Sequence, residues 1–148
     1  MSTHASNEYF RNAVLTAKPE QLQMMLYDGA IRFARQGREA LLRKDFETAC
    51  EKLIRVQKII SEMQNGLRPE INAELCDQLA RLYNFIYQRL VDANVQRDVE
   101  PLEEALRILE HQRETWRLLL ERIGTVSGDA PRQSDSPKSG NETLSIQG

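Results

Sequence analysis

Two histidines are the side chains in this sequence best suited to catalysis or metal binding. His111 lies in a predicted helix, and His4 lies close to the N-terminus. A di-iron helical bundle requires Glu-x-x-His pairs, but the residue three positions before His111 is Ile108. Histidine phosphotransfer requires an exposed histidine on a helix, so His111 leaves that interpretation open. With no Gly-rich phosphate loop and no activated Ser or Cys, the sequence indicates no enzyme, no metal site and no cofactor.

The two cysteines are isolated from each other and from both histidines. Cys50 and Cys76 form no Cys-x-x-Cys motif, and neither has a histidine at metal-ligand spacing. We expect two small core residues in a reducing compartment, with a bridge between them as the alternative.

Charge and hydropathy narrow the range of partners. The chain of 148 residues has 20 Lys and Arg against 22 Asp and Glu, which gives a net charge of −2. A field of this size favours neither nucleic acid nor an anionic membrane surface. The first ten residues lack the pattern of a signal peptide, and the longest strictly apolar run is Met24 to Tyr27. We therefore expect a cytoplasmic protein of one domain without membrane insertion.

Four helices are predicted between the capping and breaking residues of the sequence. Pro suits the first turn of a helix, Asp suits the position before it, and Gly suits the position after its end. The predicted helices run from Pro19 to about Arg43, from Asp45 to near Gly66, from Pro69–Asn72 to about Arg97, and from Asp98 to Gly124.

Apolar residues recur along these helices at alternating spacings of three and four, which places them on one face of each helix. We expect these faces to form the core. The later three helices contribute Ala49, Leu53, Val56, Ile60 and Met63; Leu75, Leu79, Leu82, Ile86 and Ala93; and Leu102, Leu106, Leu109, Trp116, Leu120 and Ile123.

Helices of this length joined by short turns predict an all-α fold, an antiparallel up-and-down four-helix bundle. The predicted boundaries are an N-terminal flexible segment and cap over residues 1–17, a helical domain over 18–123 and a disordered tail over 124–148. Gly29 is expected to mark a close helix crossing, and Asp28 and Arg113 are expected to form an ion pair.

Two of the predicted helices carry more apolar surface than one core face requires. The third has a second row that includes Tyr83, Tyr87 and Asn94, and the first has Tyr27 and Ile31 beside its main stripe. One interpretation is that each helix contacts both of its neighbours in the bundle. The other is a long hydrophobic groove for another chain, because Tyr and Met suit adaptable contact surfaces.

A short apolar segment precedes the first predicted helix. Glu8 to Leu15 includes Tyr9, Phe10 and Val14 and is too short to be a stable helix alone. It is either a fixed part of the core or a detachable flap over the groove.

Several runs of this sequence resemble the flagellin-specific secretion chaperones of bacterial flagella. The resemblance rests on Glu8 to Val14, Thr16 to Leu22, Met25 to Ala30 and Tyr83 to Asn94, and it covers about residues 8–122. Lys18 departs from the pattern, because the family often has a capping Ser or Thr there.

The resemblance implies an export chaperone that binds the disordered C-terminal segment of flagellin, prevents early polymerisation and delivers it to the flagellar type III export apparatus. Export-gate and regulatory proteins as further partners, and the choice between monomer and homodimer, are left open. The alternatives are a histidine phosphotransfer bundle and another helical adaptor. The residues assigned to partner binding, in groove or core, are Tyr9, Val14, Tyr27, Ile31, Leu53, Ile60, Tyr83, Tyr87 and Asn94.

Overall fold

The computed structural model describes residues 19–132, and the side chains of residues 20–122. This part of the chain contains helices and turns but no strand. The chain divides into two units, through Arg113 and from Glu114 onward, which we describe separately. The helices are α2 (Pro19–Leu42), α3 (Phe46–Asn65), α4 (Ala73–Gln96) and α5 (Val99–Arg132).

Side-chain caps fix where three of these helices begin. The Asp45 carboxylate accepts a hydrogen bond from the Thr48 backbone N–H at 3.2 Å, and hydrogen bonds from Thr48 hold the pKa of this carboxyl below its usual range. Asn72 Oδ1 accepts from the Leu75 N–H at 3.1 Å, and Asp98 Oδ1 accepts from the Glu100 N–H at 3.0 Å. These caps confirm the predicted helix starts.

The turns after α2 and α4 place cationic residues in the left-handed region. Lys44 has φ of 63° and Arg97 has φ of 53°. In each turn, backbone N–H groups donate hydrogen bonds to carbonyl groups of the preceding helix. For example, the Asp45 N–H donates to Ala40 O at 2.8 Å. Glycine is the usual residue at such a position, because a Cβ there crowds the following carbonyl oxygen.

Replacing Lys44 with glycine is therefore expected to stabilise the protein. Relief of a left-handed conformation is worth roughly 1–2 kcal/mol, and the greater freedom of glycine in the unfolded chain offsets about half of it. We expect Lys44→Gly to raise the free energy of unfolding in a urea titration by roughly 0.5–1 kcal/mol. Lys44→Ala removes the same charge and keeps the Cβ, so it should give no gain. If both variants raise the free energy of unfolding equally, the gain comes from removal of the Lys44 charge and not from the backbone conformation.

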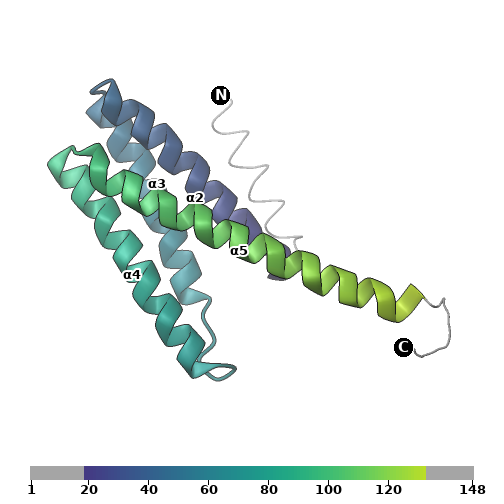
Figure 1. Ribbon diagram of the computed structural model, residues 1–148. Helices are drawn as coiled ribbons and strands as arrows, with labels where there is room; N and C mark the ends of the chain where they lie inside the picture. Colours follow the sequence, from purple (N-terminus) through teal and green to yellow (C-terminus); the bar gives the residue numbers. More distant parts are fainter. Residues whose placement is uncertain (1–18, 133–148) are drawn as a thin grey trace. The chain divides into compact units, whose positions relative to one another are not determined.

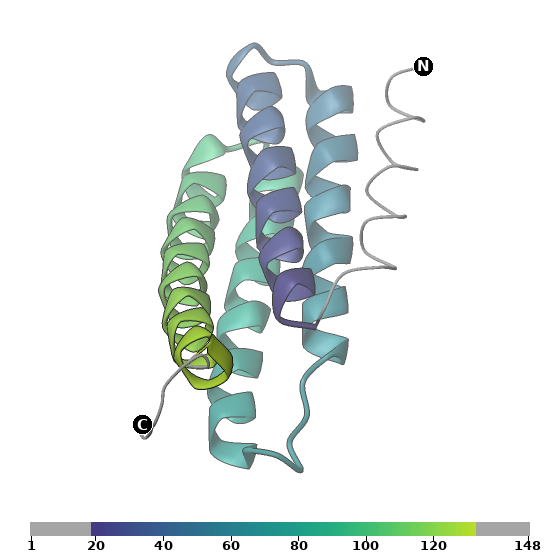
Figure 2. The ribbon, with the colours of Figure 1, turned by 90° about the vertical axis from the view of Figure 1, so that its right-hand side faces the viewer.

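In the unit that ends at Arg113, successive helices run antiparallel around one core (Figures 1 and 2). This confirms the predicted all-α, up-and-down four-helix bundle. The predicted stripe of α3 is buried along its whole length. The largest fully buried side chains are Leu53, Val56, Ile60, Tyr83, Ile86, Leu90, Leu102 and Leu109.

α2 and α3 approach each other closely at Gly37. A Cβ built on this glycine would lie 3.2 Å from Leu53 Cδ2. Gly29 is also buried, and the close crossing expected there stays a prediction. A residue without a side chain at this position lets the Leu53 side chain enter the space beside α2.

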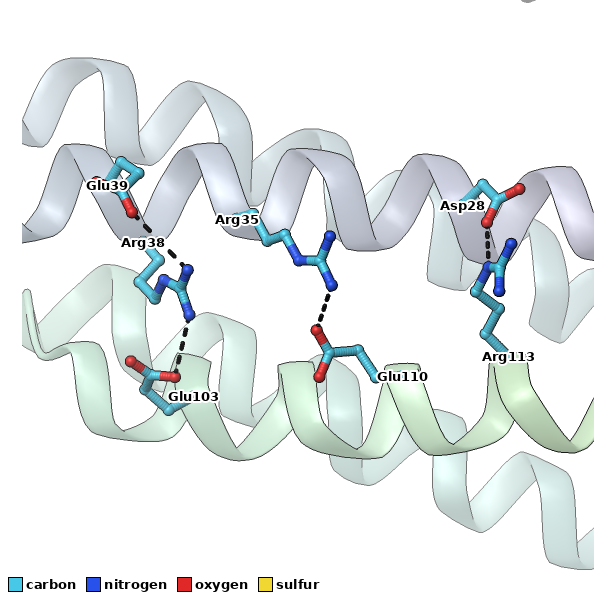
Figure 3. Close-up of polar contacts among 7 residues, drawn as sticks. All are labelled: Asp28, Arg35, Arg38, Glu39, Glu103, Glu110 and Arg113. Atoms are coloured by element: carbon cyan, nitrogen blue, oxygen red, sulfur yellow. Dashed lines mark hydrogen bonds and ion pairs between the residues drawn. The ribbon is translucent and has the colours of Figure 1, made fainter.

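Three ion pairs join α2 to α5 along one side of the bundle (Figure 3). Arg38 Nη1 lies 3.6 Å from Glu103 Oε1, and Arg35 Nη2 lies 2.7 Å from Glu110 Oε2. Arg113 pairs with Asp28, which confirms the predicted ion pair.

The core face of α4 differs from the predicted stripe. Ile86 and Ala93 of that stripe are buried as predicted. Leu75, however, is 48% exposed and Leu79 and Leu82 are half-buried, whereas Tyr83 of the second row is fully buried. Two apolar rows one position apart satisfy the same helical period, so periodicity alone does not decide between them.

The described part of the second unit is a helical segment. Within it, the Arg117 Nη2 lies 2.7 Å from Glu114 Oε2, and Nη1 lies 3.8 Å from Glu121 Oε2. Trp116 and Leu120 were predicted to be core residues, but they are only half-buried. The helix was also predicted to end at Gly124, but it continues to Arg132. Gly124 and Gly128 each lower helix stability by only about 1 kcal/mol, so neither glycine alone is enough to end the helix. The predicted domain boundaries stay a prediction.

Candidate functional site

An apolar row remains uncovered along the first half of α4. We call Leu75, Leu79, Leu82 and Phe85 the α4 row. Leu75 and Phe85 are 48% and 45% exposed, and the other two are half-buried. Spacings of three and four keep all four residues on one side of the helix, over a length of about 15 Å.

The row is uncovered because the described core begins only partway along α4. No residue between Ala73 and Leu82 is fully buried, and Tyr83 is the first that is. Ile71, just before the helix, is 80% exposed. Singly exposed apolar residues are ordinary, but several in one row form a surface suited to a partner.

Tyr83 joins α4 to α2 beneath the surface. Its hydroxyl accepts a hydrogen bond from Gln23 Nε2 at 3.2 Å and lies 3.4 Å from the hydroxyl of Tyr27. Burial, followed by the neighbouring Tyr27, raises the pKa of Tyr83 above its ordinary value. The Tyr83 hydroxyl therefore stays protonated and serves as a structural hydrogen-bonding group.

Most residues assigned to partner binding from the sequence lie in the core. The five fully buried ones are at most 5% exposed, so they support the surface rather than form it in this structure. They are Tyr27, Ile31, Leu53, Ile60 and Tyr83.

Two of the assigned residues reach the surface, on the side of α4 that faces α3. Tyr87 is 38% exposed, and the half-buried Asn94 donates a hydrogen bond through Nδ2 to Cys50 Sγ at 3.5 Å. Tyr9 and Val14 lie outside the described residues, as does the flap that they belong to. A partner-binding role stays a prediction for all of these residues.

The side chains considered for chemistry are not gathered into one site. His111 is exposed, and Cys50 and Cys76 are free thiols that are half-buried instead of fully buried. Among the described side chains, no three His, Cys, Asp or Glu residues lie close enough to hold a metal ion. None of the helices in residues 19–132 is long and apolar enough to cross a membrane.

The sequence identified the α4 row but assigned it to the core. Leu75, Leu79 and Leu82 were expected to be buried, and Phe85 was not singled out. The available signal was the excess of apolar residues on α4, which is apolar over a wider arc than one core contact requires.

The sequence is similar to proteins of the bacterial flagellum. The family model described as "Flagellar protein FliS" matches residues 1–122. The chain is 36% identical over 109 residues to the flagellar secretion chaperone FliS of Bacillus subtilis, covering 74% of this chain and 80% of that protein. It is 33% identical over 107 residues to the FliS chaperone of Salmonella typhimurium, covering 72% of this chain and 79% of that protein.

The fold is also similar to a solved structure. The crystal structure of a flagellar chaperone from bacteria aligns with a TM-score of 0.66 at 24% identity, covering 82% of this chain and 99% of the other.

Proposed function

The chain belongs to the FliS family of flagellar secretion chaperones, and from this premise we propose that it binds the C-terminal segment of flagellin. Binding keeps newly made flagellin from polymerising in the cytoplasm and brings it to the flagellar type III export apparatus. The family favours this function over histidine phosphotransfer or an unrelated adaptor role.

The physical basis of such a function is the covering of a self-associating surface. A segment that pairs with copies of itself in a filament is apolar on one side, and that side nucleates assembly while it is exposed. A groove or row that covers it prevents nucleation. Coupled folding of the segment offsets several kcal/mol of the contact energy, which keeps the complex reversible.

The α4 row is the observation that carries this proposal. Its length of about 15 Å matches about ten residues of an amphipathic helix, which presents anchors at positions i, i+3, i+4 and i+7. The exposed side chains of Leu75 and Phe85 supply anchor sites at the two ends of the row.

A simple energy estimate indicates that the row is not the whole site. Fully burying a Leu or Phe side chain contributes about 1.5–3 kcal/mol, and the members of the row are already partly buried. Four such residues therefore supply roughly half of the 8 kcal/mol that micromolar affinity requires. For this reason we keep Tyr87 and Asn94 in the proposed site.

Calorimetry with a synthetic peptide of flagellin's C-terminal segment tests the proposal. We expect Leu75→Asp and Phe85→Asp each to weaken binding by about tenfold or more, because each places a charge in an apolar contact. Leu42→Asp is the control, since Leu42 is 59% exposed at the end of α2 and outside the proposed site. It should change the affinity by less than about twofold.

Two results would contradict the proposal. If no variant and not even the parent chain binds the peptide, the flagellin assignment is wrong. If Leu42→Asp weakens binding as much as Phe85→Asp does, the loss of affinity is not specific to the α4 row. Circular dichroism of each variant checks that the helices are intact.

A further inference from the structure

Three cationic side chains converge on one aromatic ring where α2 meets α3. Arg32 Cζ lies 4.9 Å, Arg55 Cζ 5.3 Å and Lys52 Nζ 5.7 Å from the centroid of the Phe33 ring. The ring attracts each cation but does not neutralise its charge, and like charges gathered around one ring repel one another. An anion placed among them would remove that repulsion.

Two of these cations lack a carboxylate partner. Arg55 Nη2 lies 3.6 Å from Glu51 Oε2. Neither Arg32 nor Lys52 forms an ion pair with any residue in the described range 20–122. Most of their charge is therefore balanced only by solvent and by the Phe33 ring.

A groove continues from Arg32 along α2 toward α5, with a volume of about 630 Å³. Inside it, Arg35 pairs with Glu110 at 2.7 Å, and Arg113 pairs with Asp28 (Figure 3). The three arginines of the groove, which include Arg32, outnumber its two carboxylates. The lining residues are Asp28, Ile31, Arg32, Arg35, Gln36, Glu110 and Arg113.

Taken together, these residues form a positive band on a chain whose net charge is −2. Arg32 and Lys52 form no ion pair with a described residue, so the band carries positive charge that its own carboxylates do not balance. We call this set the basic band, and it consists of Arg32, Arg35, Lys52, Arg55 and Arg113 around Phe33, with Asp28, Glu51 and Glu110.

We propose that the basic band is a docking surface for an acidic peptide segment of a partner protein, separate from the α4 row. Carboxylates of the segment would occupy the position between Arg32 and Lys52, and the chain would continue along the groove. The carboxylates of the band favour a peptide over a nucleic acid, because backbone N–H groups of a peptide can donate to Asp28 and Glu110. A phosphate backbone has no such donors, and these carboxylates repel it.

Fluorescence anisotropy with model peptides tests this proposal on the full chain. The probe is a fluorescein-labelled peptide of about twelve residues in which Glu and Ala alternate, compared with otherwise identical Gln and Lys peptides. At about 50 mM salt we expect the Glu peptide to bind about tenfold more tightly than the Gln peptide, and at about 300 mM the difference should shrink.

Paired variants separate the band from the overall charge of the protein. Arg32→Gln combined with Lys52→Gln should weaken binding of the Glu peptide by about tenfold. The matched control is Arg68→Gln combined with Arg107→Gln, which removes the same charge from exposed positions outside the band. The control should stay within about twofold of the parent.

Four results would overturn the proposal. Equal loss in the control pair would attribute binding to net charge, and equal binding of the Glu and Gln peptides would exclude recognition of carboxylates. Tighter binding of a DNA duplex than of the Glu peptide would identify a nucleic-acid surface. A dimer of the parent in sedimentation analysis that the Arg32 and Lys52 pair abolishes would identify an interface between copies of this chain.

Discussion

Replacing Tyr83 with alanine is expected to lower the free energy of unfolding by about 3–5 kcal/mol, because it removes a large, fully buried ring from the core of the bundle. The loss also leaves the Gln23 amide and the buried Tyr27 hydroxyl without the hydroxyl that they contact. Urea titration followed by circular dichroism measures the change.

A second variant at the same position separates packing from hydrogen bonding. Tyr83→Phe keeps the ring and removes only the hydroxyl, so it should cost about 1–2 kcal/mol. If the two substitutions cost the same, the hydroxyl contacts and not the ring dominate. If Tyr83→Ala leaves stability unchanged and abolishes peptide binding, Tyr83 belongs to the client surface and not to the core.

Replacing Leu53 with alanine is expected to lower the free energy of unfolding by about 2–5 kcal/mol. The glycine opposite the Leu53 side chain favours the upper half of that range. Leu53 is fully buried and packs against Gly37. Gly37 has no side chain that could move into the cavity left by the Leu53→Ala substitution. On that side, the cavity can therefore close only if the backbone of α2 moves toward α3.

A double-mutant cycle with Gly37 makes this prediction sharper. In the parent, Gly37→Ala gains about 1 kcal/mol of helix propensity but forces its Cβ to 3.2 Å from Leu53 Cδ2. In the Leu53→Ala background that contact is gone, so Gly37→Ala should restore about 1 kcal/mol or more. Strict additivity of the two substitutions would mean that the side chains do not share one cavity.

The positions of the helices could be predicted from local chemistry. Asp45, Asn72 and Asp98 carry side-chain oxygens at the first turns of their helices, and each forms the hydrogen bond that its type predicts. The turns at Lys44 and Arg97 could not be predicted in the same way, because neither residue type favours a positive φ.

The candidate site was harder to predict than the fold, because helical spacing reveals a face of a helix but not what covers it. Tyr27 and Ile31 were assigned to partner binding on grounds that apply equally to core residues, and they are buried. Leu75 and Leu82 were assigned to the core by the same spacing, and they are not fully buried. Burial depends on how far each neighbouring helix extends, which is a property of the tertiary structure.

The charges along the α2–α5 seam have a consequence for states other than the native one. Each partly exposed pair adds only about 0–1 kcal/mol to native stability. However, sliding α5 along α2 by two helical turns in one direction brings Arg113 opposite Arg35, and sliding it in the other direction brings Glu110 opposite Asp28. Either misaligned bundle therefore sets like charges against each other. The ion pairs between α2 and α5 act mainly by raising the free energy of these misaligned bundles. They therefore increase the energy difference between the native structure and other compact structures, which favours folding to a single structure.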